Sequence, residues 1–326
     1  MVDAVALELN TLTLQQHGRV LTASYADPPL NFVTTAFVRD LDVLSAAVDR
    51  DTSVGAVVLT GGIEGRFLTH ADPTELGDAT AAPIPPLPAS ILRPLWRMTR
   101  GALRVPGALA VTEATGGAVA QALAWGYRWR RTILRMNRSS TVYIAAINGP
   151  TTGGGHEIAL ACDLRFVSDA PSIRLGQIEI LAGLIPGGGG TQRLPKILGT
   201  AKALEHMLEG APLTAEQALE LGLVNAIVPD QELVTYAQAT GARLARRSPI
   251  AVAAIKQLTY FTGSQALDVG LDSELAGFLA AGLAPAMREI LAAFATDLTR
   301  LGDSPLSSGD EAWIDGTRVP QTGVNP

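Results

Sequence analysis

The sequence has one cysteine, few aromatic residues and no long apolar run, and each scarcity excludes a class of protein. Cys162 has no partner for an intramolecular disulfide, so a reducing compartment and a cytoplasmic location are expected. Aromatic residues make up 5% of the chain and the net charge is −6, which disfavours a nucleic-acid partner. Because no run reaches the length of a membrane-spanning helix, no integral membrane segment is expected.

Apolar residues are plentiful, and their spacing predicts an α/β fold. They make up 47% of the 326 residues, with 17% charged, so the chain can bury a large core in one large or two modest domains. Residues 19–25 and 54–59 read as strands, and residues 37–49 between them have apolar side chains at helical spacing. This strand–helix–strand order predicts a parallel sheet. Cys162 lies in an apolar helical stretch, which favours a core residue over a reactive thiol.

The second half of the chain begins with strands and then becomes helical. Residues 143–147 and 164–167 are predicted strands. Predicted helices follow over residues 201–209, 214–221, 231–246, 249–260 and 264–301. Thr214 and Gln217 have the spacing of an N-cap residue and its capping-box partner. Residues 303–326 are rich in Gly, Ser and Pro and are predicted to form a mobile tail.

Residues 78–138 differ in composition from the rest of the chain. Several prolines at 83–88 predict a stiff connector. Nine arginines against two acids give the segment a net charge of +7; the arginines are residues 93, 97, 100, 104, 128, 130, 131, 135 and 138. The first four share one helical face. That face is either solvated or contacts an anionic partner, such as a phosphate-bearing cofactor or an acidic surface.

The clearest chemical signal is the glycine run 153–155, which is followed by Glu157 and, further along, by a second carboxylate at Glu179. Glycines allow close approach of the backbone, and the start of a helix leaves N–H donors free, so a site for a carbonyl group is indicated. Neither this run nor the one at 187–190 completes a dinucleotide fingerprint or a P-loop. The remaining use is a backbone oxyanion site.

Further motifs lie on both sides of the glycine run. They are the segments 57–61 (Val-Val-Leu-Thr-Gly), 67–72 (Phe-Leu-Thr-His-Ala-Asp), 144–149 (Ile-Ala-Ala-Ile-Asn-Gly), 153–163, 175–179 (Leu-Gly-Gln-Ile-Glu), 183–186, 189–194 and 218–228. In order and spacing these segments resemble the crotonase (enoyl-CoA hydratase/isomerase) superfamily. The similarity covers residues 19–260, apart from the arginine-rich insert.

The resemblance implies a crotonase-like core of stacked ββα units in residues 1–210, interrupted by the insert at 78–138, and a helical trimerisation region in residues 211–302. It also implies a homotrimer or a hexamer and an acyl-CoA thioester as substrate. Two backbone N–H groups, matched by motif to Ala71 and Gly154, would form an oxyanion hole for the thioester oxygen. Each such donor is worth about 3 kcal/mol as an enolate forms. No metal and no separate cofactor are expected, since coenzyme A enters as part of the substrate.

Glu157 and Glu179 match the two glutamates of the hydratase members of that superfamily. Addition of water across a conjugated double bond requires a proton to leave water and a proton to reach the α-carbon. Two carboxylates can share this work if burial and mutual repulsion keep one proton nearby. Taken singly, Glu157 could cap or pair within its helix and Glu179 could be a surface charge. Their joint placement in two family motifs favours catalysis.

His70 departs from the family pattern, which has small residues, often Ala-Gly, before the first donor. It could point into the pocket as a polar or acid–base group, or it could have a structural role. His156 is expected to pack away from the substrate. Substrate contacts are predicted for His70, Asp72 and Leu30. The loop 27–31 matches the family loop near the nucleotide end of coenzyme A only in part, because the usual arginine is missing.

The insert enters between the two halves of the predicted site, where the acyl pocket of the family is walled. We expect Trp96, Trp125 and Trp129 to include residues of that pocket or its rim; the alternative is that they form the core of an extra helical layer. The basic insert could also compensate for the missing arginine at the nucleotide end.

The sequence favours an enzyme that hydrates a 2-enoyl-CoA to a 3-hydroxyacyl-CoA through a stabilised thioester enolate. A double-bond isomerase is the nearest alternative, and a thioester or β-diketone hydrolase is another that gains support from His70. A non-catalytic acyl-CoA-binding subunit is the alternative from another class. The intact Glu157 and Glu179 speak against it, and the altered residue before Ala71 speaks for it.

Overall fold

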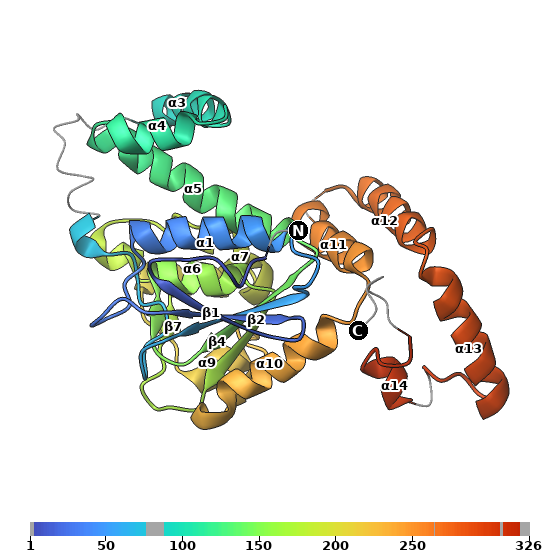
Figure 1. Ribbon diagram of the computed structural model, residues 1–326. Coiled ribbons are helices and arrows are strands. Elements are labelled where there is room, and N and C mark those ends of the chain that lie inside the picture. Colours follow the sequence, from blue (N-terminus) through green and yellow to red (C-terminus); the bar gives the residue numbers. More distant parts are fainter. Residues whose placement is uncertain (1–2, 76–87, 264, 307–308, 320–326) are drawn as a thin grey trace.

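A twisted sheet covered by helices on both faces forms the centre of the molecule in the computed structural model, which describes residues 3–75, 88–263, 265–306 and 309–319 (Figure 1). The described strands of this sheet are ordered β1-β2-β3-β4-β6-β8. Their bounds are β1 Leu12–His17, β2 Val20–Tyr25, β3 Ala56–Gly61, β4 Val142–Ile147, β6 Leu164–Ser168 and β8 Ala226–Val228. Strand β1 is antiparallel to β2 and the other pairs are parallel, so the predicted α/β fold is confirmed.

Helices cover the sheet and also form two groups beside it (Figure 1). Those of the core are α1 Thr35–Val48, α6 Gly153–Ala161, α7 Gly190–Leu198, α8 Thr200–Glu209, α9 Ala215–Glu220 and α10 Leu233–Leu244. The insert contains α3 Ala89–Ala102, α4 Ala108–Thr115 and α5 Ala118–Arg138. The C-terminal group contains α11 Pro249–Gln257, the π-helix η3 Leu258–Thr262, α12 Leu267–Gly282, α13 Met287–Leu301 and α14 Glu311–Ile314. Shorter elements are the strand pair β5 Thr151–Thr152 and β7 Leu175–Gly176 and the 3-10 helices η1 Glu179–Ala182 and η2 Asp230–Glu232.

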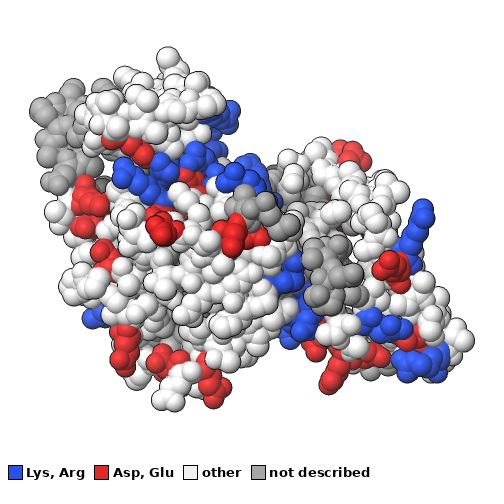
Figure 2. Space-filling model, in the orientation of Figure 1, with Lys and Arg blue, Asp and Glu red and all other residues white. Residues whose placement is uncertain are grey.

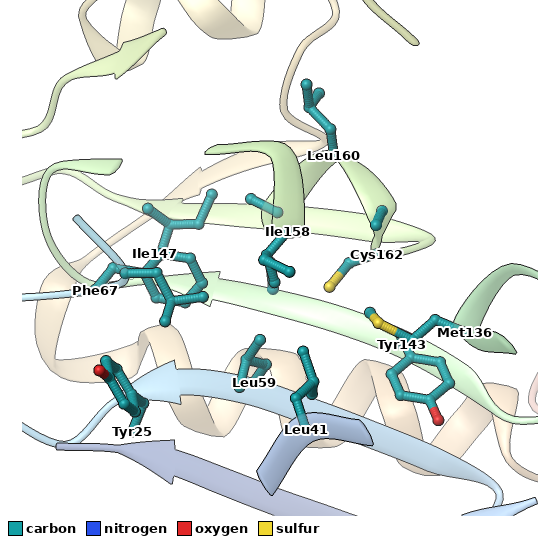
Figure 3. Close-up of a cluster of buried hydrophobic side chains, with 14 of the residues drawn as sticks. Tyr25, Leu41, Leu59, Phe67, Met136, Tyr143, Ile147, Ile158, Leu160 and Cys162 are labelled. Carbon is teal, nitrogen blue, oxygen red and sulfur yellow. The ribbon is translucent and has the colours of Figure 1, made fainter. Parts of the chain in front are cut away.

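Successive side chains of the central strands point to opposite faces of the sheet and build two separate cores. Leu59 and Ile147 lie on the face covered by α1 and α6, among the buried apolar side chains that Figure 3 shows. Val58 and Ile144 lie on the other face, which α10 covers. Cys162 belongs to the first core, and burial raises the pKa of its thiol to about 12. The prediction that it is a core residue is confirmed.

Local sequence signals predicted the start of α9 correctly but missed the break between α12 and α13. Thr214 and Gln217 form the predicted capping box at the start of α9. The single helix predicted over residues 264–301 is wrong, because α12 and α13 meet at an angle of 80°; Ser264 itself lies outside the described residues. Pro285 lies in the break, where it removes a backbone donor and restricts the residue before it.

The insert is joined to the core by a buried carboxylate. Asp42 of α1 accepts from Arg128 at 2.6 Å and from Arg135 at 2.8 Å, and it also pairs with Arg131. Arg128 bonds to Glu113 of α4 at 2.8 Å as well. Acidic and basic side chains lie next to each other over α1 and α5 in Figure 2. Three of the nine arginines of the insert therefore attach it to the core, while residues 93, 97, 100, 104, 130 and 138 have no ion pair within the described part of the chain.

Two further predictions concern the proline-rich connector and the C-terminal tail. The predicted connector prolines at 83–86 lie outside the described residues. Where the composition predicts a mobile tail, residues 309–319 contain α14. Its Trp313 donates through Nε1 to Asp297 of α13 at 3.0 Å, and Arg318 pairs with the same carboxylate at 2.6 Å. The composition of residues 303–326 did not indicate that Trp313 and Arg318 would both bind Asp297.

Helices α12 and α13 expose an unusual amount of apolar surface. Leu275, Phe278 and Leu283 are 57%, 72% and 84% exposed. No single helix in the described residues has the length and apolarity to cross a membrane, and α12 and α13 meet that test only as a pair bent by 80°.

Candidate active site

The glycine run at the start of α6 lets two backbone segments meet at contact distance. A Cβ atom at Gly155 would lie 2.1 Å from the carbonyl oxygen of Leu68 and 2.3 Å from that of Thr69, so a larger residue would displace this loop. The N–H of Thr152 donates to Thr69 O at 2.9 Å. The run therefore holds the loop against the first turn of α6.

The two N–H groups predicted to form an oxyanion hole lie at this contact. A Cβ position at Gly154 is 3.6 Å from the nitrogen of Ala71. Gly154 lies in the first turn of α6, where N–H groups have no intrahelical partner and the helix dipole favours negative charge. Ala71 is fixed from the other side, since Val33 N–H donates to His70 O at 2.8 Å and Asp72 N–H donates to Val33 O at 3.2 Å. The structure thus brings the two predicted donors together.

Glu157 lies on the first turns of α6, and main-chain donors hold its carboxylate. Oε2 accepts from Gly188 N–H at 2.7 Å, and Oε1 accepts from Gly190 N–H at 2.8 Å. Burial raises the pKa of Glu157 to about 7; the charge of Glu179 adds to the rise, and the two N–H groups oppose it. A carboxyl group that titrates near neutral pH can both give and take a proton.

Glu179 reaches the same place from a different element, the 3-10 helix η1. Its Oε1 lies 3.6 Å from a Cβ position at Gly153, beside the glycine run that leads into Glu157. The side chain is only partly buried, and burial raises its pKa as well. The structure therefore brings both predicted catalytic carboxylates to one glycine-lined point, and both have a raised pKa.

A polar chain connects α6 to Glu179. With the Gln177 amide placed so that its oxygen accepts from Nδ1 of His156 at 3.0 Å, its nitrogen donates to the two oxygens of Glu179 at 2.8 and 3.1 Å. This is the orientation in which both atoms of the amide are satisfied. His156 is fully buried, and burial lowers its pKa to about 3, so the ring is neutral and can carry the proton on Nδ1. Gln177 and His156 together fix the direction of Glu179.

The three residues with predicted substrate contacts lie around the loop that carries Ala71. His70 is partly buried, with Nδ1 2.9 Å from Ala71 O and its ring centre 4.9 Å from that of Phe32. Asp72 accepts from Thr74 N–H at 2.7 Å. Leu30 is 38% exposed, and its carbonyl oxygen accepts from Thr69. His70 is thus engaged with its own loop, while Leu30 stays open to solvent.

Trp129 of α5 brings the insert to the site. Its Cη2 lies 3.2 Å from a Cβ position at Gly154. A Cβ position at Gly188 would be 2.4 Å from the indole Nε1 and 2.6 Å from Glu157 Oε2, so the ring and the carboxylate are neighbours across Gly188. Trp125 lies next to Trp129, with ring centres 5.0 Å apart and the rings tilted by 33°. Of the three tryptophans predicted to include residues of the acyl pocket or its rim, the structure places Trp129 beside Gly154 and Glu157.

No role was predicted from the sequence for Gly188, Gly190 or Gln177. A signal was present in each case. The two glycines belong to a second run at a helix start, which contributed to the family resemblance without indicating that its N–H groups bind Glu157. Gln177 lies two residues before Glu179 in the same motif, but its contact with His156 depends on the packing of α6.

Comparisons with known proteins find similarity to one enzyme family. Residues 111–295 match the model of the family described as Enoyl-CoA hydratase/isomerase, a stretch that includes Gly154, Glu157 and Glu179. The chain is 28% identical over 252 residues to a short-chain-enoyl-CoA hydratase of Clostridium acetobutylicum, covering 77% of this chain and 81% of that one. It is 30% identical over 254 residues to a probable enoyl-CoA hydratase of Bacillus subtilis, covering 77% and 83%. Among solved structures, DspI of Pseudomonas aeruginosa is similar with a TM-score of 0.71 and 27% identity, over 90% of this chain and 98% of that one.

Proposed function

Because the chain belongs to the enoyl-CoA hydratase/isomerase family and has its fold, we propose that it hydrates 2-enoyl-CoA thioesters to 3-hydroxyacyl-CoA thioesters. One observation carries the proposal: Glu179 lies beside Gly153 and near enough to Glu157 for its charge to raise the pKa of Glu157, and the same glycine run brings the N–H groups of Ala71 and Gly154 together. Two carboxyl groups and two backbone donors at one point are what this addition needs.

The backbone donors act on the thioester oxygen. When this oxygen accepts from the N–H groups of Ala71 and Gly154, electron density leaves the conjugated double bond and the β-carbon becomes electrophilic. Addition at the β-carbon then gives an enolate whose negative charge lies on the same oxygen. The donors are already in place and need no reorganisation, so they stabilise the enolate more than the substrate.

The carboxyl pair moves the protons. A water held between Glu157 and Glu179 loses one proton to the ionised member as its oxygen bonds to the β-carbon. The protonated member delivers its proton to the α-carbon as the enolate collapses, so water is added in full and the pair keeps one proton. Because the two charges interact, this proton belongs to the pair rather than to one residue. The carboxyl groups and backbone donors supply the whole reaction, and no metal or redox cofactor is required.

A double variant tests the proposal. The purified wild type is expected to consume crotonyl-CoA with formation of 3-hydroxybutyryl-CoA, and E157Q/E179Q is expected to lose this activity while it keeps the circular dichroism spectrum of the wild type. Turnover of a 3-enoyl-CoA without hydration would point to an isomerase. Release of free coenzyme A would point to a thioester hydrolase, and binding without turnover would point to an acyl-CoA-binding subunit.

We further propose that copies of the chain associate through α12 and α13 as a homotrimer or a hexamer. The exposed Leu275 and Phe278 of α12, Leu283 at its end and Leu291 of α13 support this, because a concentration of exposed apolar side chains is typical of a protein interface. Light scattering is expected to give the mass of three or six copies for the wild type and a smaller mass for F278D/L283D. An unchanged mass for the variant would contradict the choice of surface.

A further inference from the structure

A cleft of about 770 Å³ is lined by Trp129 but by neither of the two carboxylates. It runs between α3, α5 and the segment 186–197, and its volume is within the range of about 300–1,000 Å³ that is typical of small-molecule sites. The lining is largely apolar; Trp96, Leu123, Ile133, Leu134 and Ile197 contribute to it. The cleft can therefore accept a hydrocarbon chain.

Trp129 and Gly188 border both the cleft and the candidate active site. They line the cleft, while Ala71, Gly154 and Glu157 do not. The indole ring also lies against Gly154 and, across Gly188, against Glu157. Trp129 is 4% exposed. The ring is thus a wall, one side chain thick, between the reaction centre and the cleft.

Packing alone keeps this wall in place. The indole Nε1 of Trp129 has no hydrogen-bond partner among the described residues, and Trp125 lies next to the indole with ring centres 5.0 Å apart. The glycine at 188 leaves room for the ring, because a Cβ there would lie 2.4 Å from Nε1. Replacement of Trp129 by a small residue removes the wall without removing a donor or acceptor of the catalytic carboxylates.

The position of the wall relative to the proposed chemistry determines what it would do. If the thioester oxygen lies at Ala71 and Gly154 and the β-carbon at Glu157, a chain that continues past Glu157 would meet the ring of Trp129, which is the neighbour of that carboxylate across Gly188. We propose that Trp129 ends the acyl pocket, so that the enzyme takes short-chain enoyl thioesters, and that loss of the indole joins the pocket to the cleft. This inference rests on the proposed function.

Affinity as a function of chain length tests the wall directly. Each methylene group that becomes buried raises affinity about fourfold. In the wild type, the affinity for butyryl-, octanoyl- and dodecanoyl-CoA is expected to stop rising after the short chains. In W129A it is expected to keep rising, so that the ratio of dodecanoyl to butyryl affinity increases at least about tenfold. Hydration of the corresponding 2-enoyl thioesters is expected to show the same change in kcat/KM.

Two further variants separate the wall from general loosening. W125A removes the neighbouring indole and leaves the wall, so it is expected to keep the chain-length profile of the wild type. Gly126 also lines the cleft, and a Cβ there meets no atom within 4 Å, so a side chain at this position would begin in open space. The double variant W129A/G126F refills the cleft and is expected to lose the gain for long chains.

The possible results distinguish a failure of the proposed function from a failure of the role assigned to Trp129. Binding of all three thioesters without hydration of any enoyl thioester would overturn the proposed function and leave the wall testable by affinity. A wild type whose affinity rises steadily up to dodecanoyl-CoA would overturn the wall, even if W129A failed to fold. An identical profile for folded W129A and wild type, or the same gain in W125A, would overturn it as well.

Discussion

The two carboxylates of the candidate site are held in opposite ways. Glu157 is 3% exposed and is held by the main-chain N–H groups of Gly188 and Gly190. Glu179 is partly buried, begins a short 3-10 helix, and is held by the side chain of Gln177. Main-chain donors cannot be removed by a side-chain substitution, whereas a side-chain donor can.

This difference determines how each carboxylate tolerates a neutral replacement. A glutamine at 157 would place one amide NH₂ against an N–H of Gly188 or Gly190, and a buried unpaired donor costs about 1–3 kcal/mol. A glutamine at 179 could accept from Gln177 and turn its NH₂ toward solvent. E157Q therefore changes both the acid–base group and its hydrogen bonds to the main chain, whereas E179Q changes mainly the acid–base group.

The largest effect is expected for E157Q. Loss of an acid–base group costs about 10²–10⁴-fold, and the donor conflict at Gly188 and Gly190 brings the expected loss of kcat for crotonyl-CoA hydration to about 10⁴-fold. The midpoint of thermal unfolding is expected to fall as well. If E157Q kept its stability and lost less activity than E179Q, the main-chain donors would not be essential to the site.

E179Q is expected to lose about 10²-fold in kcat with little change in thermal stability. Its side chain can keep the bond to Gln177, so only the proton-transfer step is removed. E179D is a matched control, since it retains the charge but shortens the side chain. Equal losses of thermal stability in E179Q and E157Q would contradict the inference that main-chain donors hold Glu157 whereas a side chain holds Glu179.

The secondary structure was more predictable from the sequence than the tertiary contacts between its elements. The short continuous apolar runs of residues 54–59 and 143–147 predicted buried parallel strands, because such a run is typical of a strand covered on both faces. The break between α12 and α13 was missed although Pro285 marks it, since the apolar spacing continues on both sides. The strand β1 was also missed, because its apolar alternation stops after Leu14 and the consecutive polar residues Gln15 and Gln16 follow.

In the candidate site, family motifs predicted which residues to consider but not how they are supported. Glu157 and Glu179 were found by motif, and the structure places them together. The N–H groups of Gly188 and Gly190 are 31 and 33 residues along the chain from Glu157, whose carboxylate they bind. These contacts, like the contact between His156 and Gln177, depend on tertiary packing between segments that are 20 or more residues apart. Sequence spacing holds no information about such contacts.

The pH dependence of stability is expected to differ between the two carboxylates. The folded-state pKa of Glu157 is raised from 4.5 to about 7, so the folded protein binds this proton more tightly than the unfolded chain. Its contribution to the free energy of unfolding is therefore fully present below pH 4.5 and is lost as the pH rises through about 7, a change of about 3 kcal/mol. Urea unfolding at a series of pH values is expected to show that E157Q removes this slope. E179Q is expected to remove less of it, because its side chain is more exposed, and an unchanged slope in E157Q would contradict the raised pKa.

The smallest effect is expected for Q177L, which removes the side-chain support of Glu179 and leaves both carboxylates in place. The amide N–H groups favour the ionised form of Glu179, so their loss raises its pKa and moves the pH profile of kcat/KM for the coupled pair to higher pH. One lost hydrogen bond to a charged group corresponds to about a tenfold decrease in kcat/KM at neutral pH. Q192L is a suitable control, because Gln192 is exposed on α7 and bonds only to Thr191 among the described residues. A purely structural role for Gln177 would lower stability without moving the profile, whereas an upward shift in Q177L alone would show that Glu179, unlike Glu157, depends on a single side chain for its proton affinity.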